Sequence, residues 1–113
     1  RDREKRPIMG KIAQDLADRI IITDEENYTE DATQIREEII SGISKKNEKL
    51  PANIQEIPDR KEAIRKALQI AGKGDVVLIT GLGHEVYRVI DGEKTPWNDT
   101  QIVREIAQEI FKK

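Results

Sequence analysis

Cysteine is absent from this 113-residue sequence, and histidine occurs only once, as His84. Without cysteine there is no disulfide, no thiolate nucleophile and no cysteine-based metal site. A lone histidine needs carboxylate partners to bind a metal, and no spacing in the sequence fixes them, so we predict no metal ligands. No apolar run approaches the length of a membrane span, and no secretory signal is present. We therefore expect a cytoplasmic protein that does not contact a membrane.

An excess of one charge is also lacking, since acidic and basic residues are interspersed and the net charge is -2. This distribution predicts no nucleic-acid surface. The length suits one domain that is large enough to bury a core. The first residue is not methionine, and the charged opening from Arg1 to Arg6 does not begin a fold. This start is typical of a domain, residues 1–113, cut from a longer protein, although a processed or disordered terminus would give the same opening.

Several catalytic motifs are missing as well. Gly81-Leu82-Gly83 is followed by a predicted strand, whereas a dinucleotide-binding fingerprint opens a helix. No phosphate-binding loop is present. Ser41 and Ser44 come late in a predicted helix and not at a nucleophile elbow. We predict no catalytic residue within this domain, which suits one wall of a larger site better than an isolated catalyst.

The most informative stretch that is present runs from Asp75 to Val86. Val76 to Thr80 form an apolar, β-branched run, which predicts a strand covered by helices on both faces. Glycines then allow a sharp turn, and His84 and Glu85 follow it. Ligands of open α/β sheets bind outside the carboxyl ends of the strands, so these two residues are candidates for binding, although an exposed glycine turn is the alternative.

Strands and helices alternate along the rest of the chain. Helices are predicted after Pro7 to about residue 18, from 31 to 44, from Asp59 to 71, and from Asn98 onward, and Asp59 and Asn98 are expected to cap the last two. The first is expected to bury an apolar face made by Ile8, Met9, Ile12, Ala13, Leu16 and Ala17. Further strands are predicted at 19–23 and 54–57, and a hairpin at 86–90 and 93–95. The predicted fold class is α/β, a Rossmann-like three-layer domain with a mainly parallel sheet and an antiparallel edge hairpin.

Two motifs at opposite ends of the chain resemble the C-terminal domain of the Mur ligases, specifically the UDP-N-acetylmuramoyl-tripeptide synthetase (MurE) branch. Residues 1–10 are similar to that family's Gly-Gly-Asp-Arg-Asp-x-x-Lys-Arg-Pro-x-Met-Gly motif. Residues 74–85 resemble its Gly-Asp-Val-Val-Leu-Ile-x-Gly-Lys-Gly-His-Glu signature. Residues 59–64 and 96–99 also look like family segments, in the same order. The resemblance covers essentially the whole chain.

The resemblance implies a three-domain ligase. Its first domain would hold the UDP-sugar, its central domain would bind ATP and Mg2+, and this third domain would receive the amino acid. The implied reaction is phosphorylation of the carboxylate of a UDP-muramoyl-peptide by ATP, followed by attack of the amino acid's amine on the acyl phosphate. The implied partners of this domain are therefore the amino acid, the UDP-muramoyl-peptide and the central ATP-binding domain. By itself the domain is expected to be inactive.

The resemblance also implies binding residues. Arg1 matches the family arginine that grips the amino acid's carboxylate, a task suited to a guanidinium. Gly81 and Glu85 match positions that contact the far amino end of a diamino acid. For His84 we favour a hydrogen bond that shapes the loop over acid–base chemistry, because no orienting partner is evident.

Two departures from the family pattern affect specificity. The family's Asp-Asn-Pro-Arg loop is here Glu25-Glu26-Asn27-Tyr28, so Tyr28 replaces the arginine that would bind the distal carboxylate of meso-diaminopimelate. We therefore predict that meso-diaminopimelate is not the substrate. Lysine or ornithine fits Glu25 and Glu26 better, although both acids could be part of a solvated turn. Leu82 replaces a family lysine and so removes a positive charge near the site.

Two other hypotheses remain open from the sequence. The chain could belong to another ligase of this superfamily, such as an archaeal pseudomurein, folate-polyglutamate or cyanophycin ligase. It could instead be a non-catalytic binding module with a flavodoxin-like fold. A phosphate-binding loop upstream of Arg1 would favour a ligase over such a module.

Overall fold

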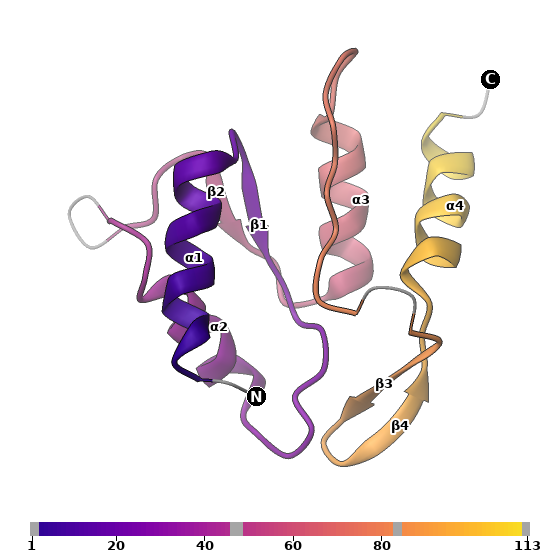
Figure 1. Ribbon diagram of the computed structural model, residues 1–113. Coiled ribbons are helices and arrows are strands. Elements are labelled where there is room, and N and C mark those ends of the chain that lie inside the picture. The colour runs from indigo at the N-terminus through magenta and orange to yellow at the C-terminus, as the bar shows by residue number, and fades with distance from the viewer. Residues whose placement is uncertain (1–2, 46–48, 83–84, 112–113) are drawn as a thin grey trace.

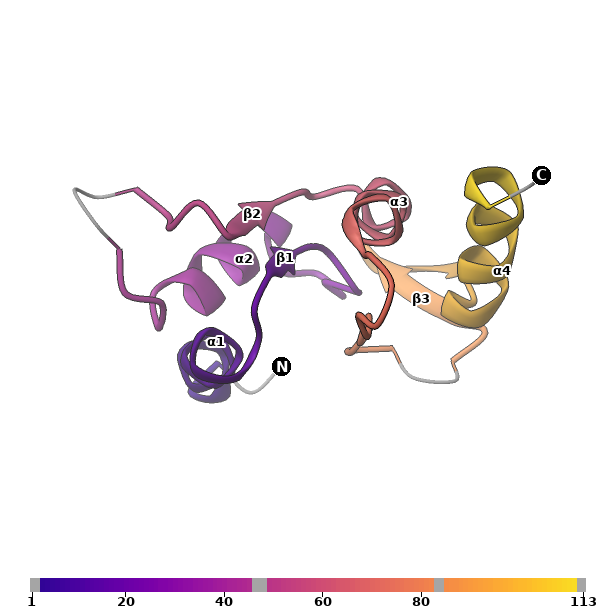
Figure 2. The same ribbon diagram turned by 90° about the horizontal axis from the view of Figure 1, so that it is seen from above.

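The computed structural model describes residues 3–45, 49–82 and 85–111. Along the chain these residues form α1 (Lys5–Leu16), β1 (Ile20–Ile22), α2 (Ala32–Ile40), β2 (Ile54–Glu56), α3 (Arg60–Ile70), β3 (Tyr87–Ile90), β4 (Glu93–Pro96) and α4 (Asp99–Ile110). Figure 1 shows α1, α2 and the β1–β2 pair at one side, and α3 and α4 side by side at the other. In the view from above, α3 again lies between β1 and α4 (Figure 2). The hairpin β3–β4 lies at the base of α4, opposite the loop that follows β1.

The strands pair as the α/β prediction requires. β1 and β2 are parallel, with Ile20 opposite Ile54, whereas β3 and β4 are antiparallel, with Arg88 opposite Thr95. Among the described residues the two pairs are separate two-stranded sheets. The predicted fold class, with parallel pairing and an antiparallel hairpin, is confirmed.

Local sequence signals set the helix starts and the hairpin turn. The Asp59 and Asn98 side chains accept hydrogen bonds from the backbone N–H groups of Glu62 and Gln101, as the predicted capping residues should. Asp91 and Gly92 join β3 to β4, and both have positive φ angles, 51° and 83°. This backbone conformation matches the twist of a tight hairpin and explains why Asp-Gly is favoured there.

The described core is mostly isoleucine. Ile22, Ile40, Ile43 and Ile54 form a buried cluster between α2 and the β1–β2 pair, and Ile20, Ile39 and Leu50 pack against it. At the other side of the molecule the buried apolar residues are Ala63, Ile64, Leu82 and Ile106. Leu82 is only 4% exposed, so its side chain belongs to the protein interior.

The prediction for residues 76–80 is wrong. This segment runs back along α3 (Figures 1 and 2), and in the described chain it pairs with no strand. Val76 and Leu78 are 90% and 83% exposed, so no helix covers that face. An apolar run shows that a segment favours extended backbone, but it does not show which elements pack on it.

The predicted buried face of α1 is also wrong. Ile8, Met9, Ile12 and Leu16 are exposed, and α1 instead buries Arg6 and Gly10. Glycine allows a close helix–helix approach, since a Cβ at Gly10 would overlap the Ile39 carbonyl oxygen. The contact between α1 and α2 is therefore made by Gly10 and by the ion pairs of Arg6, and the apolar periodicity of α1 does not predict it.

Arg6 is the main polar link between α1 and the segment 30–38. Its guanidinium is 6% exposed and donates to Glu30 at 2.9 Å and to Glu38 at 2.8 Å. Arg3 adds a second ion pair to Glu38. The hydrogen bonds from Arg6 and Arg3 lower the pKa of Glu38 from its ordinary value of 4.5 to about 2.

This depressed pKa predicts an acid-dependent loss of stability. The Glu38 contribution is fully present above about pH 4.5 and is lost as the pH falls toward 2, because only the folded state holds this carboxylate ionised. We expect the free energy of unfolding of Glu38→Gln to fall less steeply over this range than that of the unmodified chain. Urea unfolding between pH 2 and 5 measures the difference. Equal pH dependence in the two proteins would contradict this assignment.

Candidate functional site

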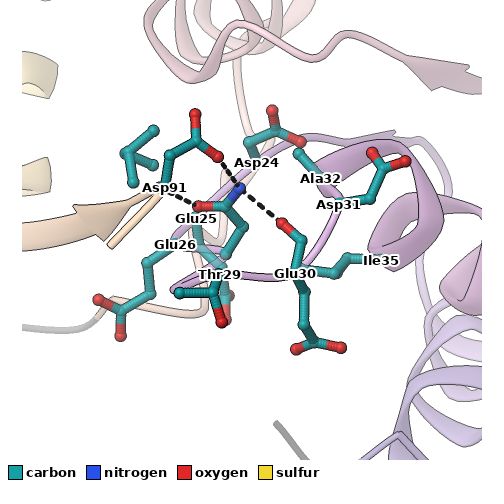
Figure 3. A pocket seen from close by; sticks show the side chains of 11 residues that line it. Asp24, Glu25, Glu26, Thr29, Glu30, Asp31, Ala32, Ile35 and Asp91 are labelled. Carbon is teal, nitrogen blue, oxygen red and sulfur yellow. Dashed lines mark hydrogen bonds between the residues drawn. The ribbon is translucent and has the colours of Figure 1, made fainter. Parts of the chain in front are cut away.

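The loop after β1 forms one wall of an acidic pocket of about 590 Å³. Figure 3 shows its side chains, which come from this loop, from the start of α2 and from the turn of the β3–β4 hairpin. Carboxylates dominate the lining, with contributions from Asp24, Glu25, Glu26, Glu30, Asp31 and Asp91. The described residues that line the pocket include no lysine or arginine. The pocket therefore favours a cationic group over an anionic one.

Most of these carboxylates already have partners. Asp24 forms an ion pair with Arg36, which also donates to Glu56, and Glu30 pairs with Arg6. The Asp31 side chain caps α2 by accepting from the backbone N–H of Thr33. The Asp91 side chain accepts from Asn27 at 2.9 Å. These groups hold the loop in place and have little capacity left for a ligand.

Glu25 is the exception. Its carboxylate accepts no hydrogen bond and forms no ion pair within the part of the chain that the structure describes. Burial raises the pKa of Glu25, and the positive charge of Arg60 opposes that shift. A partly desolvated carboxylate without a partner is costly, and an arriving ammonium would stabilise it.

Gly81 lies directly against this carboxylate. A Cβ at residue 81 would overlap Glu25 Oε2, and the φ angle of 112° is one that glycine adopts at little cost. The sequence placed Glu25 and Gly81 in the same binding site, and the structure brings them together. Glu25 follows β1, and Gly81 follows the unpaired segment 76–80, so the ends of these two segments lie together.

The other three residues of the predicted loop are turned toward the hairpin. Glu26 accepts a hydrogen bond from the Tyr28 hydroxyl at 2.6 Å and from the backbone N–H of Val89 at 3.0 Å. Asn27 is 5% exposed, and its side-chain amide donates to the Glu30 carbonyl and to Asp91. Tyr28 has a φ angle of 52°, which is uncommon for a bulky residue and is held by backbone bonds to the hairpin. In this structure Glu26, Asn27 and Tyr28 shape the loop.

Arg60, which sequence reasoning did not place in the site, ties its walls together. It is 3% exposed and donates to both carboxylate oxygens of Asp99, at 2.8 and 2.7 Å. It also donates to the backbone carbonyls of Asp24 and Thr80. Arg60 therefore joins the segment that carries Glu25 to the one that leads into Gly81. Residues 59–64 were noted only as a family-like segment, and pattern alone did not reveal these long-range contacts.

Arg88 is a second residue that the sequence did not reveal. Its Nη1 donates to the Glu25 carbonyl at 3.4 Å, and its guanidinium carbon lies 4.0 Å from the centroid of the Trp97 ring. The indole N–H of Trp97 donates to Asp99. The hairpin thus contacts the Glu25 loop through side chains as well as backbone.

The remaining predicted site residues contribute less to this geometry. Arg1 and His84 lie outside the described residues. Glu85 is exposed, and its backbone N–H donates to the Leu82 carbonyl at 3.0 Å. Among the described residues no group of three or more acidic or histidine side chains could hold a metal ion. None of the helices in the described ranges combines the length and apolarity that crossing a membrane requires.

Comparison with known proteins identifies the family. Residues 1–83 match the family described as Mur ligase, glutamate ligase domain. The chain belongs to the Mur ligase family. It is 45% identical over 106 residues to the UDP-N-acetylmuramoyl-L-alanyl-D-glutamate–2,6-diaminopimelate ligase of Aquifex aeolicus (strain VF5), and 36% identical over 111 residues to that of Clostridium tetani (strain Massachusetts / E88). A solved structure of a ligase with the same name matches with a TM-score of 0.88 and 36% identity.

These matches confirm the Mur ligase resemblance that the sequence motifs indicated, including its MurE branch. They cover 94% and 98% of this chain but only 21% and 22% of the two relatives. For the solved structure the shares are 100% of this chain and 22% of the matched chain. The chain therefore spans about a fifth of the length of the Mur ligases that it matches.

Proposed function

We propose that this chain is the C-terminal, amino-acid-receiving domain of a longer ATP-dependent amide ligase. The full protein would join an amino acid to a UDP-N-acetylmuramoyl-dipeptide in cell-wall peptide synthesis. Membership of the Mur ligase family and the names and lengths of the relatives support this proposal. The structural observation that carries it is the Glu25 carboxylate, which lies against Gly81 at the edge of an acidic pocket and has no partner among the described residues.

In this proposal Glu25 binds the distal ammonium of the incoming amino acid. A carboxylate accepts hydrogen bonds from an ammonium at short distance, and partial burial strengthens the attraction. Asp31 and Asp91 accept hydrogen bonds from uncharged donors, so they add a negative field that favours a cation. Arg1 would hold the amino acid's carboxylate. The contribution of this domain to the reaction is to orient the attacking amine, which accelerates a reaction without a catalytic side chain.

The proposal assigns ATP and Mg2+ to another part of the ligase. The described residues contain no group of three or more carboxylate or histidine side chains that could hold a metal ion. The central domain that would bind them is also the expected partner of this one. Closure of the two domains would exclude water from the acyl phosphate.

The amino acid is proposed to be lysine or ornithine. The relatives are named for 2,6-diaminopimelate, which carries a second carboxylate at its distal end. Here Tyr28 occupies the position of the arginine expected to bind that carboxylate, and it bonds to Glu26 instead. Among the described residues that line the pocket there is no lysine or arginine to replace it. A distal carboxylate would therefore meet repulsion, whereas a distal ammonium would meet Glu25.

A phosphate-release assay on the full-length protein tests both parts of the proposal. The reaction would contain ATP, Mg2+ and UDP-N-acetylmuramoyl-dipeptide, with lysine, ornithine or meso-diaminopimelate as the added amino acid. We expect release with lysine or ornithine to exceed release with meso-diaminopimelate by at least about tenfold, because one unpaired buried charge costs more than 1.4 kcal/mol. A preference for meso-diaminopimelate would retain the ligase and contradict the specificity. No release with any amino acid would contradict the ligase proposal for this acceptor.

A further inference from the structure

The Arg88 guanidinium lies beside the backbone of Glu25 and has no carboxylate partner among the described residues. Arg88, on β3, is half-buried, and its Nε is buried without a hydrogen-bond partner. Nowhere in the described ranges does it form an ion pair, and burial lowers its pKa. Buried charges are normally paired, because removing them from water is costly. Because Arg88 has no such partner among the described residues, an ion pair does not explain why its guanidinium is partly buried.

The contacts of Arg88 point to the Glu25 loop. One face of its guanidinium stacks on Trp97 at 4.0 Å, and its one hydrogen bond in the described chain goes to the Glu25 carbonyl. Arg60 holds the preceding carbonyl, that of Asp24, at 3.2 Å. Two successive carbonyls of the loop are thus held by two guanidinium groups. The Arg60 guanidinium also donates to Asp99, whereas among the described residues the Arg88 guanidinium donates only to the Glu25 carbonyl.

The residues after Glu25 are fixed by the same hairpin. The Val89 carbonyl accepts hydrogen bonds from the backbone N–H groups of Asn27 and Tyr28, and the Val89 N–H donates to Glu26. Arg88 precedes Val89 on β3 and extends this set of contacts by one residue, to Glu25. The backbone of Glu25 is therefore held at the point from which its side chain projects toward Gly81.

We propose that Arg88 is a positioning residue for the amino-acid site. Stacked on Trp97 and bonded to the Glu25 carbonyl, it fixes the backbone of Glu25 so that the carboxylate faces the ammonium of the incoming amino acid. This inference rests on the proposed function, because Glu25 is the group through which Arg88 acts. Arg88 does not contact the amino acid in this account.

The test compares three variants of the full-length protein by steady-state kinetics. Arg88→Gln removes the charge, Arg88→Lys keeps the charge but loses the flat stacking group, and Arg104→Gln is a control at an exposed arginine of α4. We expect Arg88→Gln to raise the KM for lysine by about 3- to 10-fold, as loss of one hydrogen bond does. Its kcat and its KM values for ATP and the UDP-peptide should not change. Arg88→Lys should recover part of the loss, and Arg104→Gln should match the unmodified enzyme.

A double variant separates positioning from a general structural role. If Arg88 acts through Glu25, then Arg88→Gln should not raise the KM for lysine further in a Glu25→Gln background. An equal increase in both backgrounds, or a rise in the KM of all three substrates, would overturn the inference. An unchanged KM for lysine in Arg88→Gln would overturn it as well, with the proposed function intact. An unmodified enzyme without lysine-stimulated phosphate release would overturn both.

Discussion

Glu25→Gln is expected to raise the KM for lysine of the full-length ligase by about 10- to 100-fold. A hydrogen bond to a charged group contributes about 1.5–3 kcal/mol, and each 1.4 kcal/mol corresponds to a factor of ten. Glutamine keeps the size of the side chain against Gly81 but removes its negative charge. Steady-state kinetics with lysine as the varied substrate measures the change.

Glu26→Gln provides a matched control on the neighbouring residue. Glu26 is bonded to Tyr28 and Val89, so its replacement should change the KM for lysine much less than replacement of Glu25 does. Equal effects of the two substitutions would indicate that the whole acidic loop attracts the cation and that Glu25 has no special role. An unchanged KM for lysine in Glu25→Gln would remove Glu25 from the site.

The largest loss of stability is expected from Arg60→Met, at about 3–5 kcal/mol. Removing one partner of a buried ion pair leaves the other charge uncompensated, and here that charge is Asp99, which is 6% exposed. The substitution also leaves the carbonyls of Asp24 and Thr80 without their donor. Urea unfolding of the 113-residue chain measures the free energy of unfolding directly.

Arg65→Met is the matched control for this prediction. Arg65 lies on the same helix, α3, and forms ion pairs with Glu62 and Glu109 that are much more exposed. Exposed pairs contribute about 0–1 kcal/mol, so this variant should lose far less stability than Arg60→Met. Similar losses from both substitutions would show that the Arg60–Asp99 pair does not tie the site together.

Local signals in the sequence predicted much of the fold. The caps at Asp59 and Asn98 and the Asp91-Gly92 turn depend on residues a few positions apart, so they could be identified directly. The β1 and β2 strands were also found, because short isoleucine-rich runs favour extended backbone. Features determined by neighbours distant in sequence were not found. The apolar stripe of α1 is exposed because Gly10 and Arg6 make the contact with α2, and periodicity cannot indicate that choice.

The candidate site also has residues that the sequence predicted and residues that it did not. Glu25 and Gly81 were placed in one amino-acid site by the family resemblance, which matched Gly81 to a contact of the amino acid's distal end and Glu25 to the specificity loop. The different roles of Glu25 and Glu26 could not be predicted from the sequence. Glu26 is held by hydrogen bonds from Tyr28 and from Val89, and Val89 lies 63 residues after Glu26 in the chain. Arg60 and Arg88 were missed for the same reason. Their roles come from bonds to backbone carbonyls, which have no side-chain signature in a sequence.

The most direct test of the account compares L-lysine with L-norleucine as substrates of the full-length ligase. The two amino acids share a carbon chain and differ only in the distal ammonium, the group that Glu25 is proposed to bind. We predict that kcat/KM is at least about tenfold higher for lysine, since a charge-assisted hydrogen bond is lost with norleucine. The Glu25→Gln variant should lose most of this preference. Equal use of the two amino acids by the unmodified enzyme would contradict the proposed role of Glu25.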